Sequence, residues 1–245
     1  MKTVIIVQAR MTSTRLPGKV LKPVLGMPLL AYQIERLRRV RLAAEVVMAT
    51  TTNRTDDPIA ALCEQLAVPH FRGSEEDVLA RYHAAAREYR AAHVVRVTSD
   101  CPLIDPAVID QVIAYYHQEP GRFDYVSNAL ARSFPRGMDT EVFSFTALDE
   151  AHNEAVAKPD REHVTPFINR NPARYRLGNL TYSMDASRHR WTVDTAEDLA
   201  LITLILEALY PEKPEFTLGD CLELLNQHPE WEAINAHVEQ KCYGQ

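Results

Sequence analysis

The sequence predicts an α/β fold, built on a mainly parallel sheet with helices on both faces. Short β-branched runs alternate with segments of helical periodicity over about the first 120 of the 245 residues. Two of these helical segments begin with an Asp-Pro pair, at Asp57-Pro58 and Asp105-Pro106, and proline is common in the first turn of a helix. Strand–helix alternation of this kind is typical of parallel sheets that are covered on both faces.

The first half of the chain divides into alternating strands and helices. Strands are expected at 3–7, 46–50, 68–71 and 93–97, each an apolar or β-branched run. Helices are expected at 28–42, 57–66, 74–86 and 105–116, where apolar residues recur every three or four positions. Ser74 is expected to cap the third of these helices, with Asp77 three positions later.

The pattern is less regular after about residue 120. Strands are expected at 123–127 and 138–143, short helices near 144–153 and 161–169, and further strands near 174–183 and 190–193. The last two helices are expected at 194–210, which has a clear apolar face, and at about 217–226. No internal repeat, low-complexity tract or linker interrupts the chain. Residues 1–245 are therefore expected to form a single domain with an elaborated C-terminal half at about 120–245.

Composition excludes several classes of protein. With 46% hydrophobic and 24% charged residues, the chain matches the globular average, so disorder, collagen-like repeats and coiled coil are not expected. The longest apolar-rich stretch, 199–209, is far shorter than the ~20 residues of a membrane span. The N-terminus lacks the apolar region and cleavage site of a signal peptide. Cysteines at 63, 101, 221 and 242 have no paired spacing, which predicts reduced thiols. Together, these features predict a cytoplasmic protein with no membrane partner.

The net charge of −6 is unevenly distributed along the chain. Residues 1–50 carry nine Lys or Arg against two Glu, whereas the remaining residues carry 18 bases and 31 acids. A basic N-terminal segment on an acidic body indicates an anion site near the amino end. Arg36, Arg38, Arg39 and Arg41 are expected to form a solvated helix face. A nucleic-acid partner is not expected, because there is no basic stripe with interleaved aromatic residues.

The loop after the first strand, QARMTSTRLPGK at 8–19, carries the sharpest signal. It combines small hydroxyl residues, a glycine that permits close backbone approach, and the cations Arg10, Arg15 and Lys19. Ligands of open α/β sheets bind outside the carboxyl ends of the strands, and backbone N–H groups with cations suit a polyphosphate. The run is neither a Walker A loop nor GxGxxG, since no earlier glycine stands at the required spacing. The alternative is an ordinary polar loop closed by a Pro-Gly turn.

Two aspartates follow predicted strands farther along the chain. Asp100 ends an apolar strand, with a proline two residues later that forces a turn, and Asp194 follows the strand at 190–193. Carboxylates at the carboxyl edge of a sheet are well placed to hold Mg²⁺. Read alone, Asp100 is more often a turn residue, and Asp194 is an N-cap with Glu197 at the capping-box position. Convergence of both aspartates on one metal would suit nucleotidyl transfer.

These segments together resemble the cytidylyltransferase family that makes CMP-activated acidic sugars, the 3-deoxy-manno-octulosonate and N-acylneuraminate cytidylyltransferases. The run STRLPGK at 13–19 is similar to the amino-terminal signature of that family. Runs that resemble the branch of spore-coat polysaccharide biosynthesis cytidylyltransferases are GSEEDVLARY at 73–82, TSDCPLI at 98–104, RGMDTEVF at 136–143, REHVTP at 161–166 and VD at 193–194. The resemblance spans about residues 3–200.

The resemblance implies a Rossmann-like α/β fold of the nucleotide-diphospho-sugar transferase type, with a loop that wraps the phosphates of CTP. It implies catalytic roles for Arg10, Lys19 and Asp100, and it implies Mg²⁺ as the cofactor, held by Asp100 and Asp194. The nucleotide-binding residues that it implies are Ala9, Arg10, Arg15, Gly18, Lys19, Asn53, Arg72 and Ser99.

The implied reaction is attack of a sugar hydroxyl on the α-phosphate of CTP, giving a CMP-sugar and pyrophosphate for cell-surface polysaccharide synthesis. On the sugar side, Asp139 and Glu141 alternate along the strand at 138–143, so both carboxylates could face the cleft; the alternative is two solvated strand residues. His163 could contact the sugar or act as a base, or it could be structural. The octulosonate enzymes have Gln-Gly or a similar pair before the metal aspartate, where this chain has Thr98-Ser99, and this difference leaves the acceptor sugar open.

Two other functions stay open. A glycosyltransferase of the same nucleotide-sugar fold would use a Mg²⁺-bound sugar donor instead of free CTP, but such enzymes lack the LPGK loop. A non-catalytic nucleotide-binding relative would bind without turnover, which the presence of Lys19 and both aspartates disfavours. The segment after residue 210 carries no signal, and it either packs on the domain or contributes to a homodimer.

Overall fold

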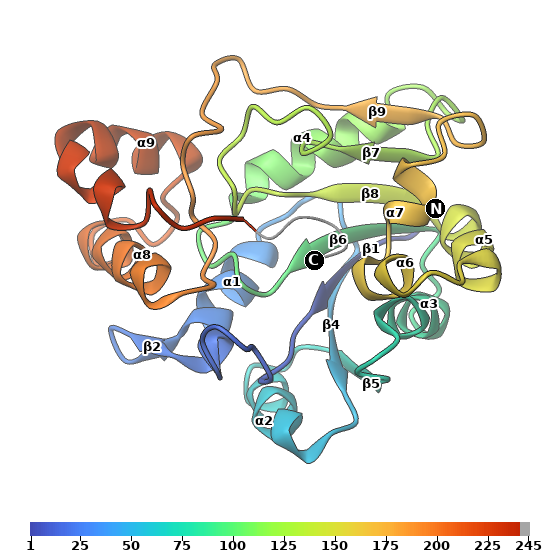
Figure 1. Ribbon diagram of the computed structural model, residues 1–245, viewed down its shortest axis with the longest axis horizontal. Coiled ribbons are helices and arrows are strands. Elements are labelled where there is room, and N and C mark those ends of the chain that lie inside the picture. Colours follow the sequence, from blue (N-terminus) through green and yellow to red (C-terminus); the bar gives the residue numbers. More distant parts are fainter. Residues whose placement is uncertain (241–245) are drawn as a thin grey trace.

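The computed structural model describes residues 1–240, and the strands of this part form one seven-stranded sheet and one short hairpin (Figure 1). In spatial order the sheet contains β5 (His70–Gly73), β4 (Glu45–Thr51), β1 (Thr3–Gln8), β6 (His93–Thr98), β8 (Glu141–Ser144), β7 (Tyr125–Ser127) and β9 (Leu177–Asn179).

Most of this sheet is parallel. β5, β4, β1 and β6 run in the same direction, with Ile6 of β1 paired with Val47 on one side and Arg96 on the other. β8 runs antiparallel to both of its neighbours, β6 and β7, and β7 pairs with β9 in parallel. The predicted α/β fold with a mainly parallel sheet is therefore confirmed. The reversal at β8 coincides with the part of the sequence where the strand–helix pattern fades.

Alternate residues of the strands supply two separate cores. Ile5 and Val7 of β1 pack against α1 (Leu29–Leu37), α2 (Asp57–Gln65) and α4 (Pro106–His117). Val4 and Ile6 point to the other face, toward α3 (Val78–Glu88), α5 (Phe145–Glu154) and α7 (Pro166–Asn169). α6 (Lys158–His163) buries no side chain of its own and lies against α3. Because side chains alternate along a strand, one apolar run such as β1 is buried on both sides.

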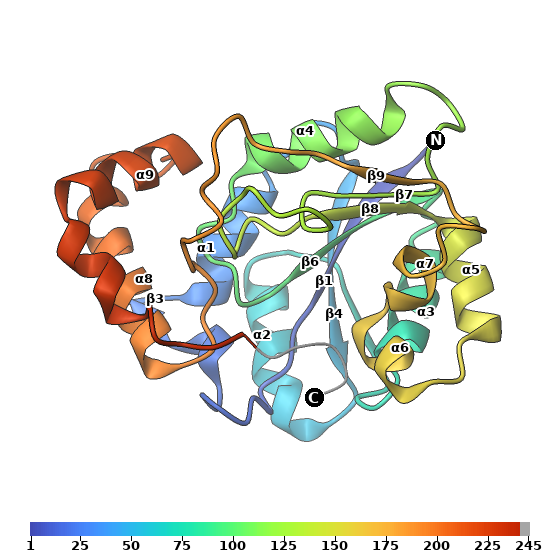
Figure 2. The same ribbon diagram turned by 45° about the horizontal axis from the view of Figure 1, so that its top comes forward.

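A third core lies at the end of the molecule opposite to α3, α5, α6 and α7 (Figure 2). It contains the buried side chains of α8 (Ala196–Leu209) and α9 (Leu218–Gln227), together with Trp191 and with Leu29 and Tyr32 of α1. The 3₁₀-helix η3 (Pro229–Ile234) packs on α8 and α9. The hairpin of β2 (Pro23–Val24) and β3 (Met27–Pro28) adds Val24. The segment after residue 210 therefore packs against the N-terminal half.

Several predicted elements differ from the structure. Residues 190–193 form no strand and make only an isolated bridge between Arg136 and Arg190. The strand expected at 174–183 is reduced to β9, and the helix expected at 28–42 ends at Leu37. The cap of α3 is Asp77, which accepts from the Ala80 amide, and not Ser74. The hairpin β2–β3 was not predicted, because strands of two residues are too short to show an alternating pattern.

The predicted solvated face of basic residues at the end of α1 is wrong for Arg36. Arg36 does not lie on a solvated face: it is 2% exposed. Its Nε donates to the carbonyl of Ile104 at 2.7 Å and its Nη2 to the carbonyl of Phe216 at 2.8 Å, with the guanidinium 4.1 Å from the centre of the Phe216 ring. The side chain thus joins α1 to the segment before α9, a role that helical spacing alone does not reveal.

Cys63, Cys101 and Cys221 are buried free thiols, and Cys242 lies outside the described residues. Burial raises the pKa of Cys63 to about 11 and that of Cys221 to about 12, which keeps both thiols protonated and unreactive. Within residues 1–240, no helix has the length and apolar character needed to cross a membrane.

Candidate active site

A cavity of about 520 Å³ opens at the carboxyl ends of β1 and β6. Its walls come from the loop after β1, the first turn of α3, the turn after β6, the segment at 136–139, the end of α6, the segment before α8 and Gln240. Within the described part of the chain, six basic side chains line it, namely Arg10, Arg15, Lys19, Arg81, Arg96 and Arg136, together with four acidic ones, Asp100, Asp139, Glu162 and Asp194. This excess of positive charge suits an anionic ligand.

Lys19 is held between the two strand-end aspartates. Its Nζ donates to Oδ2 of Asp100 and to Oδ1 of Asp194, each at 2.8 Å, although these partners are 81 and 175 positions away in the sequence. Gly18 makes this placement possible: it adopts φ +67° and its amide bonds to the carbonyl of Met11 at 3.0 Å, so the loop turns sharply before Lys19. Both predicted metal aspartates therefore converge on one cationic point.

The three groups stabilise each other's charges. Burial alone would lower the pKa of Lys19, but the carboxylates of Asp100 and Asp194 raise it above its ordinary value. Burial alone would raise the pKa of Asp100, and the Lys19 ammonium together with the Thr98 hydroxyl, 2.6 Å away, lowers it instead. The lysine is therefore charged and Asp100 is ionised near neutral pH.

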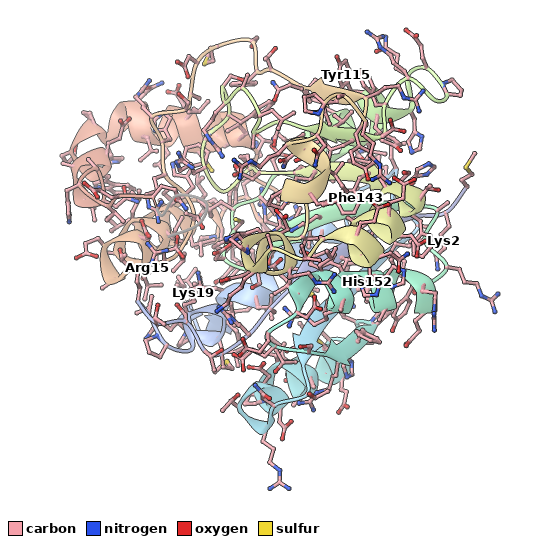
Figure 3. All side chains as sticks on the ribbon, turned by 45° about the vertical axis from the view of Figure 1, so that its right-hand side comes forward. Lys2, Arg15, Lys19, Tyr115, Phe143 and His152 are labelled. Atoms are coloured by element: carbon pink, nitrogen blue, oxygen red, sulfur yellow. The ribbon has the colours of Figure 1, made fainter. Side chains whose placement is uncertain are left out.

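Asp100 has Lys19 as its one cationic partner among the described residues, whereas Asp194 is held by two arginines in addition to Lys19. Its Oδ2 accepts from Nη2 of Arg190 at 2.9 Å and lies 2.9 Å from Nη2 of Arg15. Its expected role as an N-cap is wrong, because Thr195 caps α8, and the capping box is completed by Asp198 and not by Glu197. Asp194 is thereby left outside the helix, with its side chain directed to the cavity. Figure 3 shows Arg15 and Lys19 close together on this side of the molecule.

The residues present suit a magnesium ion. Two carboxylate oxygens, Oδ2 of Asp100 and Oδ1 of Asp194, lie within 2.8 Å of a single point, which Lys19 Nζ occupies. Among residues 1–240 no three His, Cys, Asp or Glu side chains gather to form a complete protein cage. Mg²⁺ in phosphate-transfer sites is typically bound by one or two carboxylates, with water and substrate phosphates completing its shell.

A buried carboxylate, that of Asp56, holds the loop after β1 through a backbone hydrogen bond. Asp56, which is fully buried, accepts from the Met11 amide at 2.7 Å and from the Thr51 hydroxyl. Ala9 and Arg10 follow directly on β1, and both line the cavity, as does Ser99 after β6. Arg10 is half-exposed and lies 3.5 Å from Oε1 of Glu75. Its guanidinium is thus accessible for an anion.

The structure does not bring Asn53 and Arg72 into the cavity. Arg72 donates from Nε to the carbonyl of Thr51 at 2.8 Å and from Nη2 to that of Asn53 at 2.9 Å, and it pairs with Asp57 at 2.7 Å. Asn53 in turn donates its amide to Glu75. These contacts keep the segment after β4 out of the cavity wall, because the Arg72 guanidinium bonds to the end of β4, at the carboxyl edge of the sheet, and not to groups of the cavity.

The sugar-side candidates separate into two kinds. Asp139 lines the cavity and forms a bidentate pair with Arg132, with both distances 2.6 Å. Glu141 does not line it: this carboxylate is 9% exposed, pairs with Arg96, and accepts from the hydroxyls of Tyr125 and Thr165 at 2.6 Å each. The expectation that both carboxylates face the cleft is therefore wrong for Glu141, whose polar neighbours draw it into the sheet.

His163 lines the cavity at the end of α6, next to a strained residue. Val164 has φ +72° and ψ −54°, and the Thr165 amide bonds to the His163 carbonyl at 2.9 Å. This is a γ-turn of the rare hand, which costs free energy for a β-branched residue. Loss of solvent lowers the pKa of His163, with Arg96 acting in the same direction, so the imidazole stays neutral at pH 7.

A family model described as Cytidylyltransferase matches residues 4–215. The chain belongs to the cytidylyltransferase family. The spore coat polysaccharide biosynthesis protein SpsF of Bacillus subtilis is 34% identical over 235 residues, which cover 92% of this chain and 94% of that protein. A cytidylyltransferase structure from Leptospira borgpetersenii has a TM-score of 0.91 and 32% identity, and covers 99% of both chains. The 3-deoxy-manno-octulosonate cytidylyltransferase of Geobacter metallireducens is 35% identical over 117 residues, 46% of this chain and 44% of that enzyme.

Membership of the cytidylyltransferase family confirms the resemblance that the sequence runs indicated. Three arginines of this cytidylyltransferase line the cavity without having been predicted: Arg81, Arg96 and Arg136. Arg81 is 2% exposed on α3, and its Nε has no hydrogen-bond partner among the described residues, as is also true of Arg96 Nε. A charged residue between Leu79 and Tyr82 on a buried helix face was the available signal for Arg81.

Proposed function

We propose that this cytidylyltransferase activates an acidic sugar with CTP, releasing pyrophosphate and a CMP-sugar that serves cell-surface polysaccharide synthesis. The observation that carries the proposal is the convergence of Asp100 and Asp194 on the Lys19 ammonium, beside a cation-rich loop at the carboxyl end of β1. Family membership supports CTP as the nucleotide. The names of SpsF and of the octulosonate enzyme support a sugar acceptor and a role in polysaccharide synthesis.

Asp100 and Asp194 would hold the Mg²⁺ ion in this proposal. When bound, the ion supplies positive charge to the α-phosphate and helps to orient the attacking hydroxyl. Lys19 could then turn to the phosphates, because the ion would neutralise the charges of Asp100 and Asp194. Arg10 and Arg15 extend from the same loop and would stabilise the charge that accumulates on the departing pyrophosphate. Ala9 and Ser99, which line the cavity, would let the backbone approach the nucleotide, whereas Gly18 does not line it and would act by turning the loop before Lys19.

The acceptor would bind on the opposite wall of the cavity. Arg96 and Arg136 would provide positive charge there for the carboxylate of an acidic sugar. Asp139 and His163 would bind sugar hydroxyls, with neutral His163 able to accept a proton from the nucleophile. Glu141 would act indirectly, by holding Arg96 in place. An acceptor with a carboxylate next to its reacting hydroxyl would use both sets of groups.

Thermal stabilisation by nucleotides tests the proposal first. The wild type and Asp100→Asn are heated with Mg²⁺ and either CTP, ATP, GTP, UTP or UDP-sugars. A ligand at about 100 times its Kd adds ~2.7 kcal/mol to the free energy of unfolding. We expect a CTP-selective shift that requires Mg²⁺ and disappears in Asp100→Asn, followed by pyrophosphate release when acidic sugars are added. A shift with a UDP-sugar alone would favour a glycosyltransferase, and binding of CTP without release for any sugar would favour a non-catalytic relative.

We further propose that residues 1–245 form a single domain. In support, the third core joins Leu201 and Leu225 from α8 and α9 to Tyr32 and Leu103 from the N-terminal half. A domain with one shared core should unfold in a single step. Urea denaturation followed by both fluorescence and circular dichroism tests this, because two separate transitions would show independent units.

A further inference from the structure

The C-terminal segment contacts the active site at two residues. Gln240 lines the cavity and accepts from Nη1 of Arg190 at 2.5 Å, and Asn235 makes the buried contact. Asn235 follows η3 and is 4% exposed. Its Nδ2 donates to Oδ1 of Asp198 and to the carbonyl of Arg190, each at 2.9 Å. The match to the family model ends at residue 215, so this contact is made by a segment to which the family model assigns no part.

Asp198 is the centre of this contact. It is fully buried, and both of its oxygens are used: Oδ1 accepts from Asn235 and from Arg190 Nε, while Oδ2 accepts from Arg190 Nη2 and from the amides of Asp194 and Thr195. Burial alone would raise the pKa of Asp198, but the hydrogen bonds from Arg190 and Asn235 lower it. The carboxylate therefore stays ionised and keeps Arg190 in a fixed orientation.

Arg190 transmits that orientation to the proposed metal ligand. Its Nη2 donates to Oδ2 of Asp194 at 2.9 Å while the same nitrogen lies 3.0 Å from Oδ2 of Asp198. With Arg15 also on Oδ2, the other oxygen of Asp194 is left facing Lys19 and Asp100. The guanidinium thus decides which oxygen of Asp194 points to the metal position.

We propose that Asn235 is a positioning residue for the metal and nucleotide site, acting on Asp194 through Asp198 and Arg190. The inference rests on the proposed function, because it takes Asp194 as a ligand of a divalent cation. Loss of the amide removes one of the two donors on Asp198 Oδ1 and releases the backbone of Arg190, so Asp194 is held less firmly. Groups that orient metal ligands typically change metal affinity 10- to 100-fold when they are removed.

Binding of Mn²⁺ in the presence of CTP, without acceptor, tests this directly. The dissociation constant is measured by electron paramagnetic resonance for the full-length wild type, Asn235→Ala and Asn235→Ser. Asn179→Ala is the matched control: Asn179 also joins two segments, with its amide bonded to both backbone groups of Ala131 at 3.0 and 3.1 Å, but it contacts no group of the Asp194 network. We expect about tenfold weaker Mn²⁺ binding for Asn235→Ala, a smaller loss for Asn235→Ser and no change for Asn179→Ala.

The readouts separate positioning from a loss of stability. A positioning role predicts that raising the Mg²⁺ concentration restores pyrophosphate release in Asn235→Ala, whereas a purely structural role predicts a lower melting temperature with unchanged Mn²⁺ affinity. Unchanged Mn²⁺ affinity in Asn235→Ala overturns the inference, and if that variant does not fold, Asn235→Ser decides by the same criterion. Failure of the wild type to bind Mn²⁺ with CTP, or equal binding by Asp100→Asn, overturns the proposed function instead.

Discussion

The two walls of the cavity use their charged residues in different ways. On the wall proposed to bind the nucleotide (the nucleotide wall), Lys19 pairs with Asp100 and Asp194, and all three line the cavity, where a ligand could replace these contacts. On the wall proposed to bind the acceptor (the acceptor wall), Arg96 lines the cavity, and its partner Glu141 lies behind it, where it also accepts from the hydroxyls of Tyr125 and Thr165.

This difference decides which charged groups can exchange their protein partners for a ligand. The pairs of Lys19 and the Arg96–Glu141 pair are similarly buried, with side chains 11–21% and 11–14% exposed, but Lys19, Asp100 and Asp194 all line the cavity, where a ligand can supply new partners for their charges. Breaking the Arg96–Glu141 pair costs more, since Glu141 does not line the cavity and Arg96 would keep its charge without a partner in a medium of low dielectric constant. We therefore expect the nucleotide wall to exchange its contacts when a ligand binds and the Arg96–Glu141 pair to stay in place.

The largest effect is expected from breaking the buried pair of the acceptor wall. Glu141→Gln leaves the guanidinium of Arg96 without its counter-charge, and we expect the free energy of unfolding to fall by about 3–5 kcal/mol. Urea denaturation measures the change. Asp139→Asn is the control, because the half-exposed Asp139 should cost less than about 1 kcal/mol. Equal stability of the two variants would mean that both walls hold their charges in the same way.

The next effect concerns the nucleotide wall. Lys19→Ala removes the cation shared by Asp100 and Asp194, and we expect the rate of pyrophosphate release to fall roughly 10²–10³-fold, or about 2.7–4 kcal/mol of transition-state stabilisation. Lys22→Ala serves as the control, since Lys22 lies after the same loop but does not line the cavity. A Lys19→Ala enzyme of near-normal turnover would contradict the assignment of this wall to the phosphates.

A smaller effect is expected where the two walls meet. Gly137 has φ +103°, and a Cβ added there would lie 2.6 Å from the carbonyl oxygen of Trp191. Gly137→Ala should therefore lower the free energy of unfolding by roughly 1–3 kcal/mol. Gly26→Ala separates the two causes, because Gly26 also has a positive φ but has no atom near the added Cβ. If both variants lose the same stability, backbone conformation alone accounts for the cost and contact between the walls does not.

The smallest effect concerns the protonation of His163. Since its pKa is lowered below the ordinary value of about 6.5, the neutral form persists as the pH falls through 6.5. The KM for the acceptor should be constant from pH 8 to 6.5 and rise only under more acidic conditions. His163→Asn should raise this KM by about tenfold or less, leaving the KM for CTP unchanged. A rise in wild-type KM that begins above pH 6.5 would show that the imidazole is not shielded.

The sequence predicts the nucleotide wall better than the acceptor wall. Asp100 follows a strand in a regular βαβ pattern, so its place at the edge of the sheet follows from topology alone. Asp194 was found by analogy with it, although the strand expected before it is absent and the chain is held there by the bridge between Arg136 and Arg190. The convergence of both on Lys19 depends on contacts between residues 81 and 175 positions apart, which no local pattern encodes.

Glu141 shows why the acceptor wall was harder to predict. Alternation along a strand gives two faces, but it does not say which face is the cavity when the strand lies inside a mixed sheet. β8 runs antiparallel between β6 and β7, and the partner of Glu141, Arg96, lies between Val95 and Val97 in the middle of β6 with its side chain 14% exposed. A charged residue in the middle of such a strand indicates a buried partner, and Arg96 was the sequence signal that could have located Glu141.

The late position of Asn235 in the chain has a consequence for biosynthesis. The strands β1, β4, β5 and β6 belong to consecutive βαβ units, and domains acquire structure progressively as the N-terminal part leaves the ribosome. The groups that fix Asp194 are translated long afterwards, and the amide of Asn235 is among the last. A growing chain with a complete first half still lacks Asp194 and the groups that fix it, so the proposed site for metal and nucleotide reaches its full affinity only late in synthesis, when Asn235 has been added.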